Sequence, residues 1–112
     1  MKLLAQGTVF QGEGSDCSAL YPGVCVLPSG RWLVTFRAAP AREASRDTRA
    51  VFCMSDDQGA TWSAPRAPQG DAPALDGAPG EYLLMYLTAL PGEELLSAVM
   101  WIGANPSTNP TW

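Results

Sequence analysis

Two short apolar runs joined by a tight turn form the clearest pattern along the chain. Residues 24–27 and residues 31–37 are rich in β-branched and aromatic side chains, and Pro28-Ser29-Gly30 lies between them. Runs of this kind around a Pro/Gly turn predict an antiparallel β-hairpin. Because side chains alternate between the two faces of a strand, one face would carry Trp32, Val34 and Phe36, and the other Arg31, Leu33, Thr35 and Arg37.

Further strands are expected on both sides of this hairpin. Residues 7–11 read as a short strand closed by glycines, and residues 49–54 read as a third strand after an irregular, polar excursion over 38–48. The polar turn at 55–60 leads into Thr61-Trp62, a suitable start for a fourth strand. Short strands with tight connections describe one antiparallel sheet, the unit from which radial repeat folds are made. The predicted fold class is therefore all-β.

Two more apolar runs, residues 82–90 and 95–102, are separated by Pro91-Gly92-Glu93-Glu94. Leu, Met and Glu also favour helix, so periodicity leaves helix and strand open. The shortness of the runs, the Pro-Gly turn and the aromatic residues favour strands. The proline-rich stretch before them, residues 63–80, is expected to be an irregular connector, and residues 103–112 an irregular tail.

The composition excludes several kinds of catalytic and metal-binding site. The 112 residues include no histidine, which excludes a Ser-His-Asp triad, a Cys-His dyad and histidine-based zinc sites within this chain. Three cysteines without a CxxC pair suggest neither a disulfide framework nor a zinc ribbon. Asp56 and Asp57 lack the further spaced oxygen ligands that a calcium site needs, so no metal or cofactor is expected.

Charge and the N-terminal residues bear on partners and location. A net charge of -4 argues against nucleic acid and against a polybasic membrane contact. The first residues lack the apolar run of a signal peptide, and the longest apolar region is interrupted at Pro91. We therefore expect a cytoplasmic protein with neither nucleic-acid nor membrane partners.

One motif is specific. It consists of Ser55, Asp57, Gly59, Thr61 and Trp62 at fixed offsets. A Ser and an Asp in a turn can accept hydrogen bonds from the backbone N–H groups of their own loop. Glycine supplies a positive φ, and the tryptophan brings a large apolar anchor with a donor that needs a partner. The motif predicts a self-stapled turn, with structural rather than catalytic residues.

This motif resembles the Asp-box, or BNR repeat, of the sialidase superfamily. Residues 22–37 are similar to the first hairpin of those proteins, and Asp76–Gly80 with Tyr86–Leu90 to a second blade. The resemblance implies about one and a half blades of a six-bladed antiparallel β-propeller. Its parts would be a possible closing strand at 7–11, blade one with the Asp-box at 20–66, a connector at 67–80 and the start of blade two at 81–112.

The resemblance also implies an activity, the removal of terminal sialic-acid-type sugars from glycans by an exo-glycosidase. Such enzymes clamp the sugar carboxylate with arginines and use a tyrosine nucleophile with an acid/base aspartate. Arg37 would be a substrate-binding residue and Asp47 the catalytic aspartate, whereas the tyrosine and its glutamate partner would come from later blades, so this stretch would be inactive alone. At the position of the family's first arginine, this sequence has Leu20-Tyr21-Pro22, so that arginine is absent.

Two alternatives remain open at this stage. The missing arginine favours a non-catalytic propeller module that binds a glycan or a protein. Alternatively, the Asp-box marks a hairpin in a small unrelated β domain. The expected partners are then a glycan, the remaining propeller blades, or a further copy that joins through open sheet edges.

Overall fold

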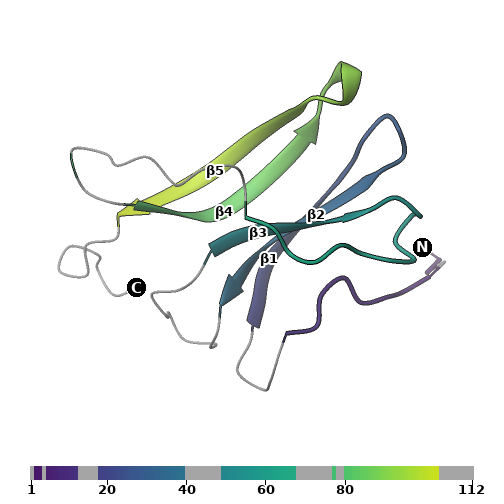
Figure 1. Cartoon of the computed structure of the whole chain (residues 1–112), viewed down its shortest axis with the longest axis horizontal. Helices are drawn as coiled ribbons and strands as arrows, with labels where there is room; N and C mark the ends of the chain where they lie inside the picture. Colours follow the sequence, from purple (N-terminus) through teal and green to yellow (C-terminus); the bar gives the residue numbers. More distant parts are fainter. Residues whose placement is uncertain are drawn as a thin grey trace.

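The computed structural model describes residues 2–3, 5–12, 18–39, 49–67, 77 and 80–103. The strands among them form two antiparallel β-sheets (Figure 1). The first sheet contains β1 (Ser18–Val26), β2 (Trp32–Ala39) and β3 (Arg49–Ser55) in that order, and the second contains β4 (Gly80–Ala89) and β5 (Leu95–Gly103). A short 3-10 turn, η1 (Pro91–Glu93), joins β4 to β5. The described part of the chain is therefore all-β, as the sequence predicts. It contains no helix long and apolar enough to span a membrane.

The predicted hairpin is formed by β1 and β2. Val26 lies opposite Trp32 and Val24 opposite Val34, so the expected alternation between the two faces is observed. Strand β1 begins at Ser18, earlier than the apolar run suggests. Its register shifts between Leu20 and Gly23, and this bulge accommodates a proline that cannot donate to the ladder.

The N-terminal residues cover one face of the first sheet. Phe36, Val51 and Cys53 form the buried centre of this face, and Val9 and Phe10 pack against it. The rings of Phe10 and Phe36 are stacked, with centroids 5.3 Å apart. Residues 7–11 do not form the expected strand. They contribute side chains to the face of the sheet instead of backbone hydrogen bonds to its edge.

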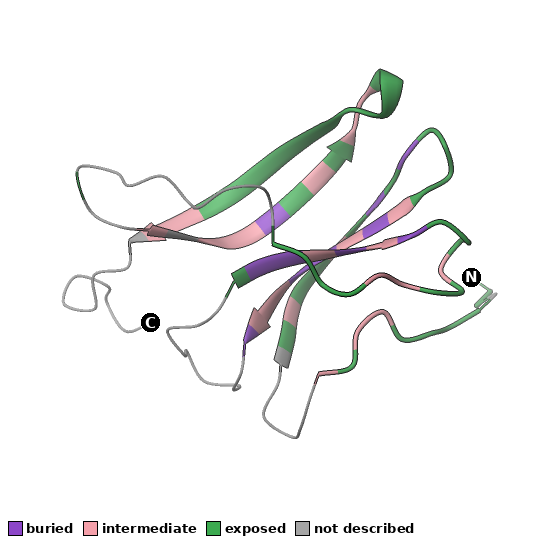
Figure 2. Ribbon diagram, viewed as in Figure 1, coloured by how far each residue is buried: buried purple, intermediate pink, exposed green. Residues whose placement is uncertain are grey.

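Strand β4 lies across the other face of the first sheet and contacts all three of its strands. Met85 is buried in this packing, as are Leu33 and Thr35 of β2 (Figure 2). A side chain at Gly23 would lie 2.9 Å from Thr35 Oγ1 and 3.4 Å from the ring of Tyr86. Glycine at this position therefore permits the close approach of β1, β2 and β4.

The expected fourth strand is reduced to a bridge. Phe52 and Arg66 exchange two backbone hydrogen bonds of 2.9 Å, and the Ser63 N–H donates to the Met54 carbonyl at 2.8 Å. Pro65 lacks an N–H group and interrupts any longer ladder. The chain nevertheless runs along the outer edge of β3, so the first sheet has a four-segment antiparallel order.

The two apolar runs at residues 82–90 and 95–102 form strands and not helices. The β4–β5 hairpin covers both runs, and Gly92 adopts φ 79° in the turn between them. A positive φ at this position suits glycine and fixes a tight reversal. Most of the expected connector at 63–80 and nearly all of the tail at 103–112 lie outside the described residues.

Candidate functional site

The Ser55 hydroxyl organises the turn between β3 and the following segment. It accepts a hydrogen bond from the Gly59 N–H at 2.8 Å and donates one to Asp57 Oδ1, also at 2.8 Å. The Ser55 residue is buried, with 2% of its surface exposed. A buried hydroxyl that both donates and accepts is fully engaged within its own loop, so it is not free to act on a ligand.

The Asp57 carboxylate closes the other half of the turn. Oδ1 accepts a hydrogen bond from the Thr61 N–H at 2.8 Å, and Oδ2 accepts one from the Thr61 hydroxyl at 2.6 Å. The hydrogen bonds from Thr61, together with that from Ser55, lower the pKa of Asp57 to about 2. Because these donors favour the charged form, Asp57 is a permanent anion at neutral pH and unsuited to general acid catalysis.

Gly59 and Trp62 complete the turn on its apolar side. Gly59 has φ 90°, and a Cβ there would lie 3.3 Å from the Trp32 ring. The Trp62 indole N–H donates to the Gly59 carbonyl at 3.1 Å, and the indole packs against the core of the first sheet. All five motif residues are thus brought together in one turn, with hydrogen bonds of the kind that their types predict.

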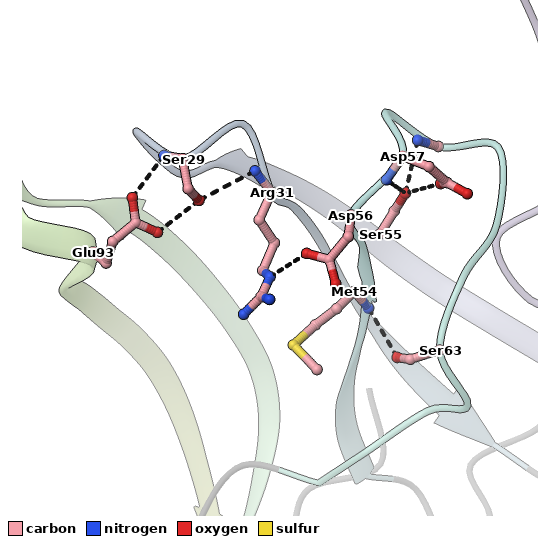
Figure 3. A network of polar contacts seen from close by, with 9 residues as sticks. Ser29, Arg31, Met54, Ser55, Asp56, Asp57, Ser63 and Glu93 are labelled. Atoms are coloured by element: carbon pink, nitrogen blue, oxygen red, sulfur yellow. Dashed lines mark hydrogen bonds and ion pairs between the residues drawn. The ribbon is translucent and has the colours of Figure 1, made fainter.

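Two polar contacts lie beside this turn, and their residues are not among the site residues that the sequence predicts (Figure 3). Arg31 Nε lies 2.5 Å from Asp56 Oδ1, and this hydrogen bond raises the pKa of Arg31. Ser29 donates from its N–H to Glu93 Oε1 at 2.6 Å and from its hydroxyl to Glu93 Oε2 at 2.7 Å. The second contact ties the β1–β2 turn to the β4–β5 turn.

Only the first of these contacts has a signal in the sequence. Trp32 pairs with Ser55 across β2 and β3, so continuing the register by one residue places Arg31 opposite Asp56. A known strand register would therefore have predicted that ion pair. Ser29 and Glu93 lie in separate turns, and no local pattern relates them.

Arg37, the candidate for carboxylate binding, lies at a distance from the motif. It pairs with Ala50 toward one end of β2, whereas Trp32 pairs with Ser55 at the other. Five residues of strand separate the two positions by roughly 17 Å. Arg37 is half-buried, and its Nε is buried without a hydrogen-bond partner among the described residues.

An unpaired donor at this depth is uncommon. Thr35 Oγ1, on the same face of β2, is likewise buried with no partner in the described part of the chain. No carboxylate among the described residues pairs with Arg37, since the one ion pair there joins Arg31 to Asp56. Among the described residues, Arg37 Nε is therefore a buried donor without an acceptor.

Other candidates find less support in the geometry. Asp47, the expected acid/base residue, lies outside the described residues. Among the described residues no three Cys, Asp or Glu side chains gather in a way that could hold a metal ion. Cys53 is fully buried, and burial raises the pKa of its thiol, so it is an unreactive core residue.

Comparison with known proteins gives no family assignment: no family model, curated protein or solved structure matches the chain.

Proposed function

We propose that the chain forms part of a sialidase-like β-propeller that hydrolyses terminal sialic-acid-type sugars from glycans, and that it is inactive without the remaining blades. The observation that carries the proposal is the hydrogen-bonded turn at Ser55, Asp57 and Thr61. This turn lies between the third and fourth segments of an antiparallel meander. Such four-segment sheets are the blades of propellers.

The packing of the two sheets is compatible with this proposal. Strand β4 lies on the face of the first sheet and does not extend its edge. Radially arranged blades pack in this face-to-face manner. The first sheet would be blade one, and the β4–β5 hairpin the beginning of blade two.

Arg37 is the substrate contact in this proposal. An arginine with an unpaired, buried Nε can bind a sugar carboxylate with two parallel hydrogen bonds. Leu20 lies directly opposite Arg37 in the β1–β2 register. A second guanidinium at Leu20 would therefore be a cross-strand neighbour able to grip the same carboxylate.

The carboxylate site can be tested on this chain by NMR titration with N-acetylneuraminate, using galactose as the uncharged control sugar. We expect N-acetylneuraminate, and not galactose, to shift the Arg37 Nε–H resonance and the backbone amides next to it, and Arg37→Gln to abolish the shifts of those backbone amides. Arg49→Gln, at an exposed arginine of β3, is the matched control and should leave binding intact. Leu20→Arg should tighten binding, whereas Leu20→Gln should not. A titration without any shift at Arg37 would contradict the assignment.

Catalysis needs a separate assay. A longer protein that contains this chain and further blades should hydrolyse a fluorogenic sialoside. The second candidate function, a non-catalytic module that binds glycans, is favoured by the leucine at position 20. Binding of N-acetylneuraminate without sialoside turnover by the longer protein would support that function instead.

A further inference from the structure

Tyr21 has a strained backbone at the bulge in β1. Its φ is 56°, a left-handed conformation that a bulky side chain rarely adopts. Pro22 follows it, and the residue before a proline favours an extended backbone, so the proline adds to the cost of this conformation. Strain of this kind persists only where the surrounding structure holds it in place, and it is concentrated at active sites and ligand-binding sites.

The bulge lies between two β1–β2 pairs whose β2 members carry unsatisfied polar groups. On one side of the bulge, Leu20 is opposite Arg37, and on the other side Gly23 is opposite Thr35. Arg37 Nε and Thr35 Oγ1 are the buried side-chain polar atoms that lack a hydrogen-bond partner in the described part of the chain, and Thr35 is only 2% exposed. Strained backbone and unsatisfied polar atoms, two independent features, therefore coincide at one point of the ladder.

The side chain of Tyr21 is left exposed at this point. Regular alternation along β1 would turn it toward the face of the sheet that Phe36 occupies. Partly buried side chains that pack on that face come from Val9, Phe10, Val34, Ala38 and Trp62. Tyr21, in contrast, is 54% exposed. Bulges re-aim side chains and are common next to active sites, so an exposed aromatic ring follows directly after the residue that is paired with Arg37.

We propose that Tyr21 is a specificity residue whose ring stacks on the sugar that Arg37 binds by its carboxylate. The proposal rests on the function proposed above for Arg37. A sugar ring presents C–H groups that pack against an aromatic face, while the tyrosine hydroxyl stays in water. Ligand sites combine such aromatic surfaces with a few placed polar groups. The strained backbone fixes the position of the ring before the sugar arrives, which lowers the entropic cost of binding.

The test combines titration with N-acetylneuraminate, followed at the backbone amides next to Arg37, with thermal unfolding of each variant. Tyr21→Gly removes the ring and adopts the positive φ without strain. Its binding should weaken roughly tenfold, while its melting temperature stays the same or rises. Tyr21→Phe keeps the ring and should bind within about twofold of the unaltered chain. Gln58→Gly is the matched control, because Gln58 has φ 58° at an exposed turn position; it should leave binding unchanged.

These measurements separate a failure of the Tyr21 contact from a failure of the carboxylate site. If Tyr21→Gly binds as tightly as the unaltered chain, with the shifts next to Arg37 intact, the contact at Tyr21 is overturned and the carboxylate site stands. Equal weakening by Gln58→Gly, or a Tyr21→Phe variant as weak as Tyr21→Gly, would likewise exclude stacking on the ring. An unaltered chain without any shift next to Arg37 would overturn the carboxylate site, and the proposed contact with it.

Discussion

Ser29 and Glu93 join the two sheets through a two-point contact between their turns. The carboxylate of Glu93 accepts one hydrogen bond from the Ser29 N–H and one from its hydroxyl. The residues are 64 positions apart in the sequence, and Glu93 adopts φ 65° in the turn that presents its side chain. The contact therefore fixes the β4–β5 hairpin at its tip, whereas the packing of β4 fixes its middle.

Replacing Glu93 tests how much this contact restrains the hairpin. Glu93→Ala removes both acceptors and leaves a non-glycine residue at the same positive φ. A typical intramolecular hydrogen bond contributes about 0.5–1.5 kcal/mol, so we expect the melting temperature to fall by several degrees. The Ser29 amide should exchange faster with solvent, which hydrogen-exchange NMR would measure. Glu94→Ala, at the neighbouring exposed acid, is the control; equal effects of the two variants would contradict the assigned contact.

The sequence was sufficient for features encoded locally. The β1–β2 hairpin and the Ser55–Thr61 turn follow from alternation and turn chemistry within short segments. Strand β1 is longer than local rules predict, because a bulge carries the strand across Tyr21 and Pro22, where those rules predict a break. Local patterns favour strands over residues 82–102 without excluding helix, and the pairing of β4 with β5 decides between the two.

Features that depend on packing between distant segments cannot be predicted from the local sequence. Residues 7–11 have the composition of a strand, but Val9 and Phe10 are used against the face of the first sheet. The unpaired Arg37 Nε depends on which elements cover β2, and the Ser29–Glu93 contact depends on how two hairpins are placed. No short-range pattern reports such relationships, because nothing in the local sequence specifies the partner.

Asp57 should make the stability of the chain depend on acid. Its pKa is lowered from 3.8 to about 2 in the folded chain. The stabilisation is therefore fully present above about pH 4 and is lost as the pH falls toward 2. Asp57→Asn should be less stable than the unaltered chain at neutral pH, and the difference should shrink below about pH 4. Urea unfolding at a series of pH values would measure this convergence.

Thr61→Val provides a second, independent variant for the same effect. It removes the hydroxyl donor to Asp57 Oδ2 but keeps the backbone donor to Oδ1. The pKa of Asp57 should rise toward its ordinary value, so the acid-induced loss of stability should become smaller. Parallel pH profiles for Asp57→Asn and the unaltered chain would show that Asp57 does not supply this dependence.

Gly59 must both adopt a positive φ and fit against the Trp32 ring. A matched pair of variants can separate these two requirements. Gly59 and Gly30 have φ of 90° and 89°, but only Gly59 has atoms within 4 Å of an added Cβ, the nearest in the ring of Trp32. Alanine at a left-handed position costs about 1–2 kcal/mol. Gly30→Ala should lose about that much stability, and Gly59→Ala should lose more because Trp32 must move. Chemical denaturation of both variants measures the difference, and equal losses would rule out the Trp32 contact.

The packing of Val9 and Phe10 on the first sheet can be tested through the thiol of Cys53, which lies in the same cluster. Cys53 has no exposed surface, and burial raises its pKa, so alkylation of the native chain should require local opening. Phe10→Ala removes the ring stacked on Phe36, a contact worth about 0.5–1.5 kcal/mol. If residues 9 and 10 cover this face, the variant should label at Cys53 roughly two- to tenfold faster. Mass spectrometry of digested chains would separate Cys53 from the other cysteines.

Val24→Ala, on the same face but at an exposed position, should leave the rate unchanged. If labelling of Phe10→Ala were as slow as that of the unaltered chain, the N-terminal residues would not protect the core.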